Sequence, residues 1–448
     1  MAYAHRALNS FAALPFISTW KTDNLSTGSS TDTQVKLPLV ATGTYKFTVN
    51  WGDGNSDAIT TWNQAQVTHT YAAIGTYTIT ITGFIKGWSF GPETPVPPST
   101  GDRLKLLTIT QFGCLKFTDA PFAFHGCYNL TLTGVTDIPN FRGITDAHGF
   151  FRLCNSITTI PNVNKWDVSK IQNFRRFFSG CNRFNSNVGN WNVSKATNFS
   201  ALFFGNQSIT EPLLGGVFNN GGSDSIKNWD TSNVTDMTST FYAQPAFNQE
   251  VGLWDVSNVT NFSSMLNSYW NNGLGADLGT FNNGGSDSIK NWDTSSAVNM
   301  NGLFSGQPLF NQNISEWYTS NVTNMGYMFQ SRYFNNGGSP DINNWDTSKV
   351  TNMSRMLQGA FAFDQPINNW NVSLVTDFIN FMSSSGLPNA YSVTNYSNLL
   401  IGWASRPVQP NRSINFSTNK YNSTAVAARA ILTSAPNNWT IADGGLQP

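Results

Sequence analysis

Apolar and polar residues alternate along residues 16–86, which is typical of strands that bury one face. The stretch TYKFTVNWGDG (44–54) alternates and then ends in a Gly-Asp-Gly turn. A second stretch, VTHTYAAIGTYTITITG (67–83), alternates again around Gly75. Strand patterns separated by turn residues at this spacing predict a small antiparallel β-sandwich over residues 16–86.

A repeat replaces this alternation from residue 104 and continues to residue 387. Its units are marked by Trp at spacings of 25, 38, 25, 38, 25, 28 and 25 residues: Trp166, Trp191, Trp229, Trp254, Trp292, Trp317, Trp345 and Trp370. Long units add NNGGS, and two of them also insert SITEPLLGGV (208–217) or NGLGADLGT (272–280). FHGCYNLTLTGV and FFRLCNSITTIP keep the same frame without Trp, so we expect about ten units of 25–38 residues.

Positions in a unit are counted from its Trp, which is position 0. Position +3 is Ser in all eight copies, and positions +5, +8 and +12 are mostly apolar, as in Val234, Met237 and Phe241. A Ser before apolar residues at helical spacing predicts an N-capped helix from about +4 to +14. An apolar residue three before the Trp, such as Ile226, predicts a short strand there. Strands of successive units would pair in parallel, and their large side chains would stack in ladders.

The two ends of the chain leave this period. Residues 1–15 are expected to form an N-terminal arm, and residues 87–103 a Pro/Gly-rich linker. Residues 388–448 contain two amphipathic stretches, TNYSNLLIGWAS and STAVAARAILTSA, followed by NNWTIADGG. They predict two short helices and a strand that cap the last repeat, because a repeat array must cover its terminal apolar face.

The phrase W-D-T-S-x-V-T-x-M, followed by F-N-x-x-I-x-x-W, resembles the BspA-like leucine-rich-repeat surface proteins, whose 25-residue repeat is the mycoplasma-lipoprotein type of unknown function. Trp51-Gly52-Asp53-Gly54, with HTY (69–71) and GTY (75–77), resembles a polycystic-kidney-disease (PKD) type domain. These resemblances imply a mixed β and α/β fold: an immunoglobulin-like β-sandwich, a leucine-rich-repeat-type solenoid with short helices and a parallel sheet, and a C-terminal cap. They also imply adhesion or surface display without catalysis.

The formal net charge is zero and only 11% of residues are charged, which argues against a nucleic-acid-binding protein. Solubility then depends on Asn, Ser, Thr and Gly, a composition commoner outside cells. No apolar stretch reaches 18 residues, so we expect no membrane span. The start MAYAHRALNSFAALPF lacks the charged and apolar regions of a secretory signal. The composition leads us to expect an extracellular or virion-surface location. Without a signal, this leaves three explanations open: a trimmed chain, an unusual export route, or a viral particle protein assembled in the host cytoplasm.

Chemistry-bearing residues are sparse. Three Cys recur 27 residues apart and predict buried free thiols stacked in register. The four His are not at metal-ligand spacing with Cys, Asp or Glu, and no catalytic motif is present. Asp53 and the Asp repeated at +1 are expected to be turn residues. NNGGSDS (219–225 and 282–288) leaves calcium binding open, although it lacks a nine-residue period. We expect no cofactor and no catalysis.

Ligand binding is expected on polar residues that flank the inward apolar residue before each Trp. The candidate ligand-facing residues are Asn187, Ser225, Lys227, Glu250, Ser288, Lys290, Asn313, Ser315, Asp341 and Asn343. Short polar groups in a row suit cell-surface glycans or proteins, while a merely solvated face is the alternative. The expected function is adhesion or recognition. A structural virion component (phage fibre or capsid decoration), contacting other virion or surface-layer proteins, stays open. A polysaccharide-degrading enzyme is the remaining alternative.

Overall fold

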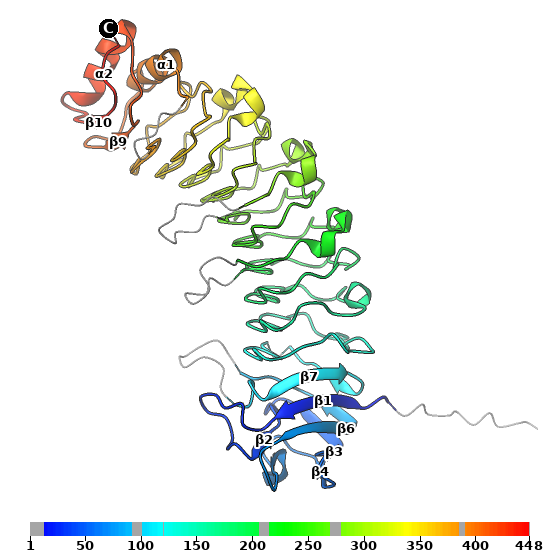
Figure 1. Cartoon of the computed structure of the whole chain (residues 1–448). Helices are drawn as coiled ribbons and strands as arrows, with labels where there is room; N and C mark the ends of the chain where they lie inside the picture. The colour runs from blue at the N-terminus through cyan, green and yellow to red at the C-terminus, as the bar shows by residue number, and fades with distance from the viewer. Residues whose placement is uncertain are drawn as a thin grey trace, which may run out of the picture.

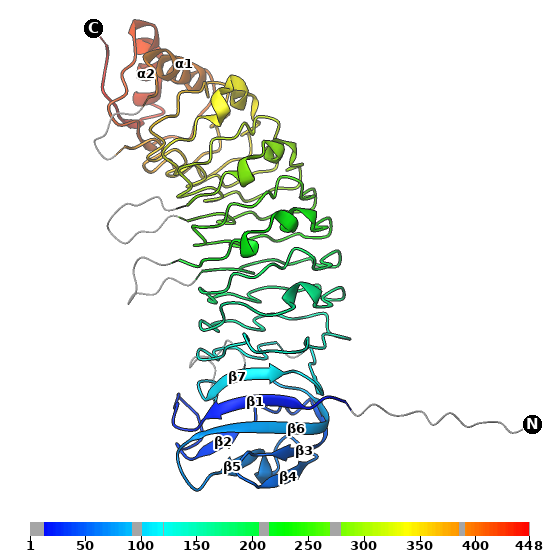
Figure 2. The same cartoon turned by 45° about the vertical axis from the view of Figure 1, so that its right-hand side comes forward.

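The computed structural model describes residues 13–91, 101–119, 121–205, 215–268, 279–384 and 390–447. Figure 1 shows a β-sheet at one end, a long, gently curved stack of repeat units, and two α-helices at the other end. The molecule is therefore elongated, and the turned view in Figure 2 shows the same rod-like outline.

The N-terminal sheet has six strands in the order β4-β3-β6-β1-β7, with β8 also paired to β6. Neighbours along that order are antiparallel, whereas β8 is parallel to β6. The alternation of apolar and polar residues decides which face of the sheet is buried. In β3, Tyr45, Phe47 and Val49 are buried, and the residues between them in sequence are exposed. The strands are β1 (Phe16–Lys21), β3 (Thr44–Asn50), β4 (Ser56–Ile59), β6 (Thr76–Lys86), β7 (Leu106–Gln111) and β8 (Leu115–Lys116).

The prediction of an immunoglobulin-like sandwich over residues 16–86 is wrong. The second sheet contains only β2 (Gln34–Lys36) and β5 (Thr68–Thr70), so two sheets of similar size do not face each other. Strands β7 and β8, expected among the repeats, complete the first sheet instead. Thr108 in β7 also bridges in parallel to Thr131, which joins the sheet directly to the first units of the stack.

The repeats are joined by single-residue parallel bridges, not by a continuous parallel sheet. The bridging residue is the Asn or Asp at +7, and its side-chain oxygen accepts from the backbone N–H at +9, as Asp236 does from Thr238 (2.9 Å). This local turn ends the pairing after one residue. The row of bridges runs through Asp146, Asn173, Asn198, Asp236, Asn261, Asn299, Asn324, Asn352 and Asp377.

The predicted helix at +4 to +14 does not form in any unit, so the leucine-rich-repeat-type solenoid of short helices and a parallel sheet is wrong. Position +10 has a left-handed backbone, with φ between 54° and 63°, which no right-handed helix can contain. The eight residues at +10 are Arg176, Ala201, Ser239, Ser264, Gly302, Tyr327, Arg355 and Asn380. In the described residues, the α-helices are α1 (Val393–Ala404) and α2 (Val426–Thr433).

Backbone pairing between units explains this conformation. The N–H groups at +8, +10, +12 and +14 donate to carbonyl oxygens of the next unit, as Met237 N does to Asn261 O (3.0 Å). Phe241 N likewise donates to Met265 O (2.9 Å). Amides of a helix would be consumed within their own unit, so here each unit satisfies its backbone only beside a neighbour.

The strand predicted before each Trp is also absent. In three long units this segment is a 3₁₀ turn that ends one residue before Trp: η4 (Asp224–Asn228), η6 (Ser288–Asn291) and η8 (Pro340–Asn344). The preceding NNGG stretch forms η3 (Asn220–Gly222), η5 (Asn283–Gly285) and η7 (Asn336–Gly338). Shorter 3₁₀ turns are η1 (Ala65–Val67), η2 (Val163–Lys165) and η9 (Ser423–Ala425).

Aromatic ladders fill the stack, as the repeat pattern predicted. Trp229 stacks on Trp191 with ring centroids 6.5 Å apart and on Trp254 at 5.8 Å. Its indole N–H also donates to Val188 O of the preceding unit (3.2 Å). Burial of side chains of this size contributes about 1.5–3 kcal/mol each, so the ladders hold neighbouring units together.

A second ladder, made of Asn, supports the long units. Asn283 is fully buried, and its side-chain oxygen accepts from Val251 N (2.8 Å) and Gly252 N (3.0 Å). Its amide donates to Ser286 O (2.9 Å) and to the hydroxyl of Ser288 (3.1 Å). The inserted NNGGS is thus an internal brace between units.

The C-terminal residues continue the ladders over the last unit. The Trp403 indole of α1 donates to Ile367 O (3.2 Å), as the repeat Trp residues do. Tyr391 stacks on Phe363 with centroids 6.0 Å apart. Strands β9 (Ser413–Asn415) and β10 (Thr440–Ala442) pair in parallel, and Asn415 O accepts from Met382 N. These contacts cover the terminal face of the stack.

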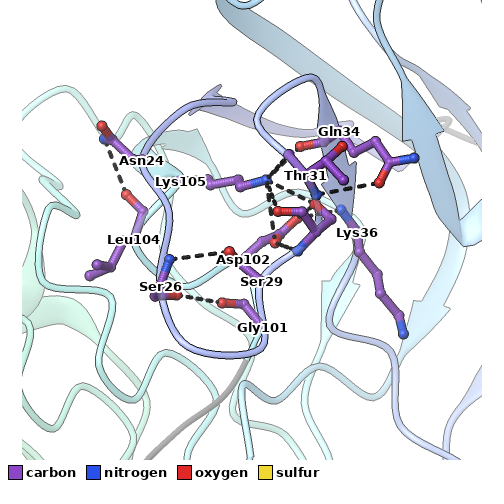
Figure 3. A network of polar contacts seen from close by, with 11 residues as sticks. Asn24, Ser26, Ser29, Thr31, Gln34, Lys36, Gly101, Asp102, Leu104 and Lys105 are labelled. Atoms are coloured by element: carbon purple, nitrogen blue, oxygen red, sulfur yellow. Dashed lines mark hydrogen bonds and ion pairs between the residues drawn. The ribbon is translucent and has the colours of Figure 1, made fainter.

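The expected linker at 87–103 is packed at both described ends, while residues 92–100 lie outside the described residues. Asp102 and Lys105 are buried beneath the 22–36 loop (Figure 3). Lys105 Nζ donates to Ser30 O (3.0 Å), Thr31 O (2.7 Å) and Gln34 O (2.8 Å). Asp102 accepts from Ser30 N (2.7 Å). This network fastens the loop to the start of β7. The arm over 1–15 lies mostly outside the described residues.

We expect Asn283→Ala to lower the free energy of unfolding by about 3 kcal/mol, because it leaves the buried backbone N–H groups of Val251 and Gly252 without a hydrogen-bond acceptor. Urea unfolding followed by Trp fluorescence measures the change. Asn291→Ala, at an exposed position of the same unit, is the matched control. Equal midpoints for the two variants would contradict an internal role of the Asn ladder.

Lys105→Met should destabilise the chain by about 3–5 kcal/mol, because it leaves the buried Asp102 carboxylate without its cation. Lys36→Met changes the same side chain at an exposed position nearby and should stay close to the parent protein. Differential scanning calorimetry compares the two. A similar melting temperature for both variants would show that the network in Figure 3 adds no stability.

Candidate functional site

The predicted ligand-facing row lies at positions −4 and −2, on turns and not on a strand. Most of its side chains bond to a neighbouring unit: the Ser225 hydroxyl donates to Asn187 Oδ1 (3.0 Å). The Ser288 hydroxyl donates to Glu250 Oε1 (2.9 Å), and Ser288 is only 7% exposed. The sequence therefore predicted that these residues lie in register, but in the fold their side chains form hydrogen bonds between units.

The remaining members of the row are held in a similar way. Lys227 pairs with Asp224 at 2.7 Å, and Lys290 with its own unit's Asp287 at 2.5 Å. Hydrogen bonds from Asn336 to Ser315 (2.9 Å) and from Asn343 to Asn368 (3.3 Å) hold two others. Asn313 accepts from Ser315 N (3.0 Å), and Asp341 bonds to Ser339 (3.2 Å).

The NNGGSDS loops use their oxygen atoms within the protein. In the first loop, Asn220 Oδ1 accepts from Val188 N (2.8 Å), and Asp224 is paired with Lys227. Within the described residues, no group of three or more His, Cys, Asp and Glu could hold a metal ion.

The Asp at +1 is a turn residue, as expected. Asp230 Oδ1 accepts from the Ser232 hydroxyl (2.6 Å) and backbone N–H (3.2 Å). The Ser at +3 is thus a donor to this Asp and not a helix N-cap. In other units, the same hydroxyl contact lowers the pKa of Asp167, Asp255 and Asp346.

The four Cys are free and buried, which confirms the prediction of stacked thiols. Cys154 Sγ donates to Phe124 O (3.0 Å) and Cys181 Sγ to Phe151 O (2.9 Å). Burial raises the pKa of the Cys127 and Cys154 thiols well above the usual range. They are packing residues and not nucleophiles.

A cleft of about 520 Å³ lies between the last units and the C-terminal strands. Its lining consists of Gln358, Asn380, Ser383, Ser384, Asn415, Ser417, Thr418, Ala442 and Asp443. The sequence pattern missed this cleft, because its two walls are separated by about 30 residues of chain and no short motif unites them. The signal that was present is the change from repeat to non-repeat near residue 388.

Asp443 is the one acid among these lining residues, and it is closed off. Its carboxylate accepts from Arg429 Nε (2.9 Å) and from the Tyr396 hydroxyl (2.7 Å). Burial and the adjacent Asp443 raise the pKa of Tyr396 above its usual range. Glycoside hydrolysis normally requires two carboxyl groups that flank the bond, and Asp443 supplies the single carboxyl group of the described lining.

Among the described residues, no helix is both long and apolar enough to cross a lipid bilayer.

The stack of in-register units defines a repeat protein. A family model described as "Mycoplasma protein of unknown function, DUF285" matches residues 145–220, 214–284 and 278–396, which together span more than half of the chain. The chain belongs to this family. Searches of curated proteins and of solved structures found no match. The PKD-type resemblance of the N-terminal residues is not matched by a family model.

Asp53 of the N-terminal sheet region is a turn carboxylate, as the sequence indicated. It accepts from Asn55 N (3.0 Å) and contacts His69 Nε2 (2.8 Å), and the His69 ring stacks on Trp51. Burial opposes ionisation of Asp53, but the hydrogen bonds from His69 and Asn55 outweigh it and lower its pKa to about 2.

A lowered pKa means that ionised Asp53 stabilises the fold above pH 3.8 and loses this effect as the pH falls towards 2. We expect Asp53→Asn to destabilise the protein by about 1 kcal/mol at pH 7, because the pair is partly exposed to solvent. The difference should shrink between pH 4 and pH 2. Thermal melts across this range measure it, with the exposed Asp32→Asn as control. A pH-independent difference would contradict the ionic role.

Proposed function

We propose that the protein is a non-catalytic recognition protein that binds glycans through the cleft beside its C-terminal strands. The proposal is supported by the chemistry of that lining, which consists of neutral amides and hydroxyls apart from Ala442 and the closed Asp443. Asn and Gln side chains donate and accept at once, and so match sugar hydroxyl groups. A cleft of about 520 Å³ is in the range that holds a small ligand.

Display on a cell or virion exterior extends this proposal. The low share of charged residues and the family resemblance to BspA-like surface proteins support it. The rod-like stack would hold the cleft away from the N-terminal sheet (Figure 2). The PKD-type resemblance of Trp51-Gly-Asp-Gly is consistent with a spacer role for that sheet.

The elongated shape also favours a second candidate, a structural virion component such as a fibre (Figure 1). Mass spectrometry of purified particles separates the two. Presence at stoichiometric copy number supports a virion role, whereas absence from particles eliminates it. A polysaccharide-degrading activity is not supported by the cleft, because Asp443 lacks a second carboxylate among the described lining residues.

For the glycan proposal, we expect Gln358→Ala combined with Asn380→Gly to weaken binding about tenfold or more, equivalent to about 1.4 kcal/mol. Gly keeps the left-handed backbone at position 380 (φ 54°) while removing the amide. A glycan array identifies the ligand, and isothermal titration calorimetry measures its affinity.

Thr376→Ala is the matched control, since this exposed side chain lies outside the cleft lining. Unchanged affinity in the double variant would remove the cleft from recognition. An array without any binding, together with clean hydrolysis of a polysaccharide, would overturn the proposed function itself.

A further inference from the structure

The net charge of the chain is zero, but two consecutive segments of the chain carry net charges of opposite sign. Residues 101–205 contain eleven Lys and Arg but five Asp and Glu, whereas residues 206–384 contain five Lys and Arg but fourteen Asp and Glu. Because the units stack in chain order, this difference becomes a charge gradient along the rod (Figure 1). One end of the stack is basic and the following part is acidic.

The opposite charges share one surface, which we name the Trp corner: positions −1, +1 and +4 around each Trp. These positions are exposed in nearly every unit. In the first two Trp units its basic residues are Lys165, Lys170 and Lys195, and in the next four units its charged residues are Asp230, Asp255, Asp293 and Glu316. The Trp345 unit carries one charge of each sign, Asp346 and Lys349. The sign therefore reverses between Trp191 and Trp229. Asp167, beside Lys170, is the exception in the basic part.

These charges are not neutralised by ion pairs within the same chain, although the Asp residues at +1 accept hydrogen bonds from the Ser at +3. Within the described ranges, none of the charged residues just named on the Trp corner forms an ion pair. Two apolar side chains are exposed on the same corner, Leu253 (57%) at −1 and Tyr318 (62%) at +1. The Trp corner thus presents unpaired charge together with apolar groups that a partner can cover.

The corner residues form continuous rows along the stack because the units are held in register. Trp191 and Trp229 are stacked at 6.5 Å, and the bridge from Asn198 to Asp236 joins the same two units. At +4, Lys349 Nζ donates to Asn321 Oδ1 of the preceding unit (2.7 Å), so side chains of one row reach each other. The net charge of the row changes sign between the second and third Trp units, so turning a second copy through 180° about that point brings net basic units opposite net acidic units.

We propose that two copies of this chain associate antiparallel through the Trp corner, with the twofold axis between the corners of Trp191 and Trp229. Lys195 then faces Asp230 of the partner subunit. Lys165 and Lys170 face Asp255 of the partner subunit, one unit further from the axis. A twofold contact satisfies both halves at once, because the same patch of each copy meets the other.

Other arrangements of two copies fit the charges less well. A parallel side-by-side pair would place basic units against basic units, which repel each other. The occupant is therefore another copy in reversed orientation. Exposed ion pairs are individually weak and are screened by salt, so the dimer is expected to be reversible and sensitive to ionic strength.

Sedimentation velocity of the full chain at about 20 mM and about 500 mM NaCl tests the proposal, since these ionic strengths change the screening length severalfold. We expect a dimer at low salt and a monomer at high salt, with a dissociation constant that rises at least about tenfold. A monomer at both salt concentrations and about 200 μM protein would overturn the proposal, as would open-ended oligomers in place of a dimer.

Two variants each reverse the charge of the units on one side of the proposed twofold axis, and they use only residues found at the same position in other units. The acidic variant carries Lys165→Glu, Asn190→Glu, Lys170→Asn and Lys195→Asn. The basic variant carries Asp230→Asn, Asp255→Asn, Asn233→Lys and Asn258→Lys. Asn preserves the turn at +1, as Asn192 does (its Oδ1 accepts from Ser194 N at 3.1 Å), so both variants should fold, which circular dichroism verifies.

Each variant alone should remain a monomer at low salt, and a one-to-one mixture should form a heterodimer. Asp341→Asn combined with Lys227→Asn alters charges away from the Trp corner and should leave the dimer intact. A dimer that persists in either corner variant, or a mixture that stays monomeric while the parent chain dimerises, would place the contact elsewhere. None of these substitutions touches the cleft, so glycan binding reports separately on the proposed function.

Discussion

Backbone pairing between consecutive units is the constraint on which the rest of the structure depends. The N–H groups at +8, +10, +12 and +14 find their acceptors in the next unit, so an isolated unit would leave them unpaired. The residue at +10, such as Ser239, has a left-handed backbone. This conformation accompanies the pairing of the amides at +8, +10, +12 and +14 with the next unit. Stability is consequently a property of neighbouring units, and the last unit requires the C-terminal residues to complete it.

The same constraint decides what side chains are available for recognition. Residues that appear free along the sequence, such as Ser225 and Ser288, are drawn into bonds between units. Asn220 and Asn283 do the same from inside the long units. Where the period ends, uncharged polar residues of the last units and of the C-terminal strands together line the cleft. The repeat units therefore form the scaffold, and the proposed ligand cleft lies where the repeats end.

Charge, unlike the apolar pattern, differs from one repeat unit to the next. Position −1, for example, carries Lys165 in the first Trp unit and Glu316 in the sixth. These residues contribute little to a single unit, since each is exposed. Stacked in register, they give the rod a basic part and an acidic part, and the proposed antiparallel association and the proposed glycan binding concern separate parts of the rod.

The sequence alone determined the period, the stacked aromatic ladders and the buried thiols, because each depends on apolar residues returning at a fixed spacing. It also determined the alternating strands of the N-terminal sheet, such as β3. It could not determine the backbone between +4 and +14: apolar spacing there matches a helix, but pairing with the next unit imposes a left-handed residue at +10. Nor could it place β7 in the N-terminal sheet, or bring Asn380 beside Asn415. Those outcomes depend on contacts between distant segments, which a local pattern does not contain.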